Sequence, residues 1–169
     1  MDTTKNVNLK IPISDWIIEI ISFGFLCVTW LIIIINYKHL PDVIPTHFNG
    51  IGQPDSFGDK QAVFILPIVA SILYMILTVL TTIPLRANAK KHSNGDENIE
   101  TLIYVWRMIR FLKMNLLFLF GAILIQTIRT ARCSANGLGL WFLPVTLCMV
   151  ILPIGYFVFK LYKSSKKNG

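Results

Sequence analysis

The residues of this sequence best suited to chemistry lie between Leu40 and Lys60, in the segment LPDVIPTHFNGIGQPDSFGDK. Its imidazole and carboxylate side chains are types that bind divalent metals or move protons. A metal site needs at least three ligands at convergent geometry, and the best two candidates here are His47 and Asp55. Their spacing matches no zinc-site or hydrolase motif, so a metal site stays a hypothesis and no cofactor is predicted.

The same segment has the composition of a compact, folded loop. Its prolines fix φ, its glycines reach conformations closed to other residues, and its Asn and Asp side chains satisfy turn amides. Both interpretations use the same side chains, which either bind a ligand or hold the loop together. These site residues are Asp42, Pro45, His47, Asn49, Gly52, Pro54, Asp55, Gly58 and Lys60.

Four apolar spans must position this loop, and they cover residues 16–35, 62–83, 111–128 and 138–159. About 20 apolar residues in a helix cross the roughly 30 Å hydrocarbon core of a bilayer. The composition agrees, because 54% of residues are hydrophobic and 15% are charged, against about 25% charged in soluble domains. We therefore predict an all-α, polytopic integral membrane protein with four transmembrane helices in one bundle, whose first partner is the lipid bilayer.

Ionisable residues are few within these spans. Glu19 and Lys113 lie near span ends, and we expect Lys113, Arg107 and Arg110 to reach the lipid headgroups. An intramembrane catalytic site or proton relay usually needs such groups nearer the middle. The pattern therefore favours a non-enzymatic protein with no catalytic residues.

The placement of basic residues predicts the orientation. Twelve of the 16 Lys and Arg residues lie on the side that holds both termini and the segment 86–113. By the positive-inside rule both termini are cytoplasmic, and residues 37–60 and 129–137 face outward from the plasma membrane. Because the net charge of +7 collects beside apolar spans, where anionic headgroups attract it, nucleic acid is excluded as a partner.

The loop also carries a resemblance. Residues 40–42 (LPD), 44–49 (IPTHFN), Gly52, 54–55 (PD), Gly58 and Lys60 stand between one membrane helix and the next. This arrangement resembles the N-terminal module of the SdpI-like membrane proteins, over roughly residues 16–84. The resemblance implies two parts: 1–84 as the SdpI-like module, and 85–169 as a polar segment, a second helix pair and a basic C-terminal tail.

The family resemblance implies immunity to a secreted toxic peptide, or signalling through a cytoplasmic regulatory protein. We therefore expect a membrane protein that recognises a toxic peptide or an envelope signal at the outer face. The charged segment 86–110 is the expected place for a cytoplasmic partner. Two alternatives stay open: a metal-dependent membrane enzyme using His47 and Asp55, and a small accessory subunit of a transporter. Assembly as a homo-oligomer is also left open.

Overall fold

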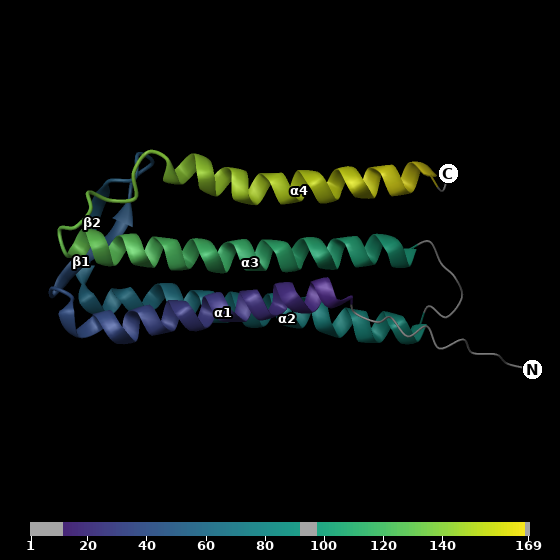
Figure 1. The fold of residues 1–169 in the computed structure, drawn as a ribbon, viewed down its shortest axis with the longest axis horizontal. Helices are drawn as coiled ribbons and strands as arrows, with labels where there is room; N and C mark the ends of the chain where they lie inside the picture. Colours follow the sequence, from purple (N-terminus) through teal and green to yellow (C-terminus); the bar gives the residue numbers. More distant parts are fainter. Residues whose placement is uncertain (1–11, 92–97, 168–169) are drawn as a thin grey trace, which may run out of the picture.

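A computed structural model describes residues 12–91 and 98–167, with side chains in 12–82 and 103–163. Within these residues the chain forms four long helices that run side by side (Figure 1). They are α1 (Ile13–Asn36), α2 (Ile65–Lys91), α3 (Asn98–Ala131) and α4 (Phe142–Lys167). The predicted all-α bundle is confirmed.

All four helices are long and apolar enough to cross a bilayer, over Ile13–His39, Lys60–Thr82, Ile103–Ala131 and Phe142–Lys163. Large apolar side chains such as Ile20, Met75 and Leu152 point outward and are about two-thirds exposed. A helix that is apolar all round faces lipid on its free sides. The chain is therefore a multi-pass membrane protein in contact with the bilayer.

Helix α3 is the centre of the bundle, because it packs against α1, α2 and α4 and also against the segment that joins α1 to α2. Because lipid tails are as apolar as Leu or Ile, this packing stabilises the bundle through close contact between the helices and not through removal of apolar surface from water. The predicted boundary after residue 84 falls inside α2. The division into two modules stays a prediction.

Helix ends differ from the sequence-based ranges in two places. Helix α4 begins at Phe142 and not at Leu138, because Gly137 and Gly139 adopt positive φ angles that interrupt the helix. The polar segment between the second and third spans is helical at both of its ends, since α2 runs to Lys91 and α3 starts at Asn98. Residues 92–97 of that segment lie outside the described residues.

The segment between α1 and α2 forms an antiparallel β-hairpin, where the sequence predicts only a compact loop. Its strands are β1 (Val43–Phe48) and β2 (Pro54–Asp59), with a bulge between Pro45 and His47. Short 3-10 turns join it to the helices at Tyr37–His39 and Lys60–Phe64. Figure 1 shows the hairpin at the end of the bundle opposite the start of α1 and the end of α4.

An apolar cluster fastens this hairpin to the bundle. Its buried members come from the hairpin and from three helical segments, and they are Ile33, Leu40, Ile44, Val63, Leu124 and Ile128. Ile44 of β1 is 1% exposed, which makes it the centre of the attachment. The position of the hairpin on α3 is therefore fixed by packing of its own strand.

Candidate functional site

Asn49 builds the turn of the hairpin. Its side-chain oxygen accepts hydrogen bonds from the backbone N–H of Ile51 (3.1 Å) and of Gln53 (3.0 Å). Its own backbone N–H donates to the carbonyl of Gln53 at 2.9 Å. An Asn side chain satisfies turn amides in this way because its short amide reaches the backbone two residues on.

An ion pair closes the base of the hairpin. Lys60 Nζ donates to Asp42 Oδ1 at 2.8 Å, and the backbone N–H of Lys60 donates to the carbonyl of Asp42 at 2.9 Å. The hydrogen bond and charge of Lys60 hold the pKa of the Asp42 carboxyl below its ordinary value. Beside it, Asp59 accepts from the N–H of Gln61 and caps the turn that leads into α2.

Glycines join the hairpin to the turn between α3 and α4. Gly52 has φ +78°, and a β-carbon on it would lie 2.6 Å from the backbone nitrogen of Gly139. The N–H of Leu138 donates to the carbonyl of Gly52 at 2.7 Å. Gln126 of α3 donates to the carbonyl of Gly137 at 3.0 Å. Only residues without a β-carbon allow this approach of two backbones, so Gly52 joins the turn of the hairpin to the turn between α3 and α4.

Three other predicted site residues also lie within these contacts. Pro45 is buried in β1 opposite Phe57, and the ring of Pro54 packs against Gly137. A β-carbon on Gly58 would lie 3.0 Å from the methyl group of Thr46 across the strands. These contacts stabilise the hairpin and its packing against the turn between α3 and α4.

His47 and Asp55 make a different kind of contact. His47 Nδ1 lies 2.5 Å from Asp55 Oδ1, across the two strands. The side chains are 68% and 43% exposed. Neither makes a hydrogen bond to any other part of the chain that the structure describes. The pair is therefore exposed, as is Asp42 in its ion pair with Lys60.

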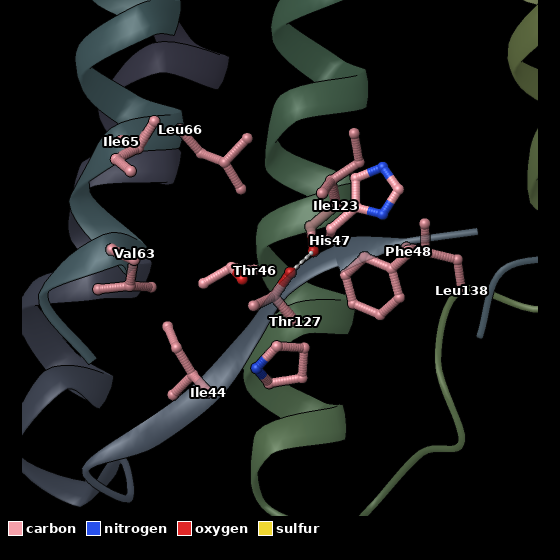
Figure 2. Close-up of a pocket in the computed structure, with 12 residues that line it drawn as sticks. Ile44, Thr46, His47, Phe48, Val63, Ile65, Leu66, Ile123, Thr127 and Leu138 are labelled. Atoms are coloured by element: carbon pink, nitrogen blue, oxygen red, sulfur yellow. Dashed lines mark hydrogen bonds between the residues drawn. The ribbon is translucent and has the colours of Figure 1, made fainter. Parts of the chain in front are cut away.

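A cavity of about 290 Å³ lies beside this pair, between β1, α2 and α3 (Figure 2). Val63, Ile65 and Leu66 line it on the side of α2, and Ile123 and Thr127 line it on the side of α3. His47, Phe48 and Leu138 complete the lining that Figure 2 labels, together with Ile44 and Thr46. The cavity is mostly apolar and opens at the loop end of the membrane spans.

The metal hypothesis gains no third ligand. Among residues 12–82 and 103–163, no group of three or more His, Cys, Asp or Glu side chains is arranged to hold a metal ion. Asp42 and Asp59 are occupied at the base of the hairpin, away from the pair of His47 and Asp55. A pair of ligands alone does not make a metal site.

A second polar cluster, which the sequence pattern did not predict, lies toward the end of the bundle at which α1 begins. Arg110 of α3 donates to Asp15 of α1 at 2.7 Å, and both side chains are buried. Arg107 Nε lies 3.2 Å from the same carboxylate in an ion pair without a hydrogen bond. The expectation that these arginines reach the headgroups is wrong for Arg110, because the partner on α1 draws it inward.

Lys113 also turns into the bundle. Its ammonium donates to Glu19 Oε1 at 2.5 Å and to Thr78 Oγ1 at 2.9 Å, and lies 4.8 Å from the centre of the Tyr74 ring. The Lys113 side chain is 0% exposed, so the predicted snorkelling is wrong. The pattern that signals this cluster is two carboxylates four residues apart facing three cations spaced by three.

Comparison with known proteins supports the family suggested by the hairpin. The Domain of unknown function (DUF1648) matches residues 24–70, from α1 through the whole hairpin into α2. An uncharacterized protein of Archaeoglobus fulgidus is 42% identical over 52 residues, which are 31% of this chain and 28% of that protein. The immunity protein SdpI of Bacillus subtilis is 30% identical over 91 residues, which are 53% of this chain.

No solved structure matches the chain. The aligned part spans 44% of the immunity protein and 28% of the archaeal one, so less than half of either relative is covered. The chain is thus similar to a domain of unknown function over residues 24–70 and distantly similar to an immunity protein.

Proposed function

We propose that this chain is a non-enzymatic immunity or signalling protein that recognises a toxic peptide or an envelope signal with its outer hairpin. The observation that carries the proposal is the exposed pair of His47 and Asp55. The other predicted site residues are committed to the fold of the hairpin, whereas this pair bonds only to itself among the described residues. Its imidazole and carboxylate are free to exchange that contact for one to a ligand.

Orientation is part of this proposal. In the sequence, twelve of the 16 basic residues flank the spans on the side of both termini and of the segment 86–113, which the positive-inside rule assigns to the cytoplasm. The hairpin then faces outward, where a secreted peptide arrives. A cytoplasmic regulatory protein would meet the opposite end, near residues 86–110.

The name of one relative, an immunity protein, supports the immunity role over a generic sensor. Because the match covers less than half of that protein, its role comes to this chain only as part of the proposal. A clean deletion of the gene tests the role directly. We expect the deletion strain to become more sensitive to secreted membrane-active peptides or to envelope stress, and unchanged sensitivity to both would contradict the proposal.

Two single variants test the site. We expect His47→Ala and Asp55→Asn to keep normal membrane abundance and thermal stability, because both side chains are largely exposed. Each should abolish the protection that the protein gives to a peptide-sensitive bacterial host. The matched control is Gln53→Ala, which removes an exposed polar side chain from the same hairpin. If the two variants lose abundance together with protection, the pair is structural and the proposed site is wrong.

A further inference from the structure

The cavity beside the hairpin lies at the edge of the membrane. Of its walls, Ile123 and Thr127 stand eight and four residues before the end of α3 at Ala131. At about 1.5 Å per residue they lie roughly 12 and 6 Å below that end. Ile65, at the start of α2, lines the cavity while remaining 59% exposed. A molecule lying in the interface between lipid and water can therefore reach the cavity from the side.

The lining sets the chemistry of the occupant. Most lining side chains are apolar, and the polar ones already have hydrogen-bond partners. Thr127 donates to the carbonyl of Ile123 at 2.9 Å, Thr46 contacts Ser56, and His47 contacts Asp55. A polar guest would lose its water over most of this lining and would gain a partner only at the exposed His47. The occupant must be apolar where it enters.

Volume sets the size of the occupant. The cavity measures about 290 Å³, whereas an apolar cavity of about 150 Å³ in a protein already binds benzene. The space therefore fits one large aromatic side chain, and it lies just below the range of about 300–1,000 Å³ usual for whole small-molecule ligands.

Charge at the mouth completes the description. Of the three carboxylates between Leu40 and Lys60, Asp42 pairs with Lys60 and Asp59 caps the turn at the base of the hairpin. Asp55 is 43% exposed beside the cavity-lining His47. The mouth of the cavity therefore carries one exposed carboxylate, which attracts cationic groups and repels the phosphate of a lipid headgroup.

We propose that this cavity binds an aromatic side chain of a cationic amphipathic peptide that lies on the outer membrane surface, with Asp55 meeting the peptide's positive charge. This inference rests on the proposed recognition function and names its ligand class. A peptide satisfies both halves of the site at once, because its apolar face carries the aromatic anchor and its polar face the lysines. A lipid acyl chain satisfies only the apolar half.

Synthetic probes test the ligand class on the full-length protein in phosphatidylcholine nanodiscs. The first probe is an 18-residue helical peptide of Lys and Leu with one Trp on its apolar face. The second has that Trp replaced by Ala, and the third has Glu at every Lys position. After subtraction of binding to empty nanodiscs, we expect the Ala peptide to bind about 30-fold more weakly than the Trp peptide, the loss typical of a buried aromatic anchor. We expect the Glu peptide to bind more weakly as well, because its charge has the same sign as Asp55.

Filling the cavity tests the site. Ala62→Leu adds bulk from the wall at the start of the second span, and Ile65→Trp plugs the cavity from its exposed rim. The matched control is Gly155→Leu on α4, where a β-carbon meets open space. We expect each filled variant to bind the Trp peptide about 30-fold more weakly and the Ala peptide unchanged, with the control like wild type. Thermal stability near the wild-type value shows that a variant is folded, and the rim variant retains the test if Ala62→Leu does not fold.

The outcomes separate this inference from the proposed function. If filled, folded variants bind the Trp peptide as wild type does, the cavity is not the site, whatever His47→Ala does to protection. If native mass spectrometry finds a phospholipid that is lost on filling while peptide binding stays unchanged, the occupant is an acyl chain and the inference is overturned. If His47→Ala and Asp55→Asn keep full protection, the proposed recognition site fails, although peptide binding by the cavity would still be measured.

Discussion

The ion pair between Glu19 and Lys113 gives the sharpest test of the packing inside the bundle. The perturbation is Glu19→Met, which keeps the volume of the side chain and removes its charge. Lys113 lies 18 residues before the end of α3, about 27 Å along a helix rising about 1.5 Å per residue. Lys113 is therefore near the edge of the roughly 30 Å hydrocarbon core that lies farther from the hairpin, and its side chain is fully enclosed by the bundle.

The size of the effect follows from the exposure of the residue left behind. Removing one partner of a buried ion pair typically costs about 3–5 kcal/mol, because the other charge stays buried without compensation. After Glu19→Met the orphan is Lys113, which is 0% exposed, so we expect a loss at the upper end of that range. After Lys113→Met the orphan is Glu19, which is 23% exposed and still near the Thr78 hydroxyl. We expect that loss to be smaller, about 1–3 kcal/mol.

The double variant Glu19→Met/Lys113→Met separates the pair from the packing of its parts. Two Met side chains fill similar space and leave neither charge behind, and such replacements are often neutral for buried pairs. We expect the double variant to lie within about 1.5 kcal/mol of wild type. The assay is reversible unfolding in mixed micelles with increasing SDS, followed by far-UV circular dichroism for all four proteins.

Two results would refute this reasoning. The first is additivity, in which the double variant loses the sum of the single losses, because the pair would then contribute no coupling energy. The second is the reverse order, with Lys113→Met costing more than Glu19→Met, because the enclosed residue would then not be the lysine. Ser14→Met is the control, since this exposed position on α1 lies outside the pair.

Three further perturbations follow from single contacts. Gly52→Ala should lower the free energy of unfolding by more than about 1–3 kcal/mol, because the positive φ of Gly52 and its contact with the turn between α3 and α4 both exclude a β-carbon. Unfolding in micelles measures this loss. Asn115→Leu should cost about 1 kcal/mol by freeing the Met149 carbonyl, which loses its helical partner at a proline; Asn115→Gln, measured alongside, should lose less. Lys60 lowers the pKa of Asp42, so their pair stabilises the hairpin at pH values above the ordinary carboxyl pKa, and this stabilisation is lost as the pH falls below that pKa. Asp42→Asn should remove that acid-dependent part of hairpin hydrogen-exchange protection.

The four spans could be predicted because their signal is compositional. An apolar run of about 20 residues is typical of a membrane-crossing helix, whatever the rest of the chain does. The ends of the helices depend on local backbone angles, which composition does not report. Leu138 is apolar like the helix after it, but the positive φ angles of Gly137 and Gly139 hold it in a turn. Periodicity does not report a backbone angle.

The hairpin could not be predicted as strands from its own residues. Strand β1 contains Pro45, and β2 reads PDSFGD, with Phe57 its one residue of high strand propensity. These segments pair because of contacts that strand propensity does not report: the packing of Ile44 against α3, the Asn49 turn and the contact with the turn between α3 and α4. The site residues were found because Gly, Pro, Asn and Asp signal a folded loop of either kind.

The buried charges were visible in the sequence but not interpretable. Lys113 near a span end is consistent with snorkelling to the headgroups and equally with pairing inside the bundle. The choice depends on whether Glu19 faces it, and so on which helices pack together. The sequence alone gives four apolar spans with little amphipathic pattern, and it does not say which spans are neighbours in the bundle. Only the packing of α1 against α3 decides that the lysine turns inward.

These contacts determine how a screen for loss of function on this protein should be interpreted. Substitutions at Asn49, Gly52 or Lys60 remove turn bonds, a backbone contact or an ion pair, so they should lower protection by lowering the amount of folded protein. Such a screen would return most of the motif without identifying a binding site. Protection divided by membrane abundance corrects for this, because a folding defect lowers both terms together. We expect only His47 and Asp55 within the motif to lower the ratio, and a ratio lowered equally at Asn49 would show that recognition uses the turn and not the exposed pair.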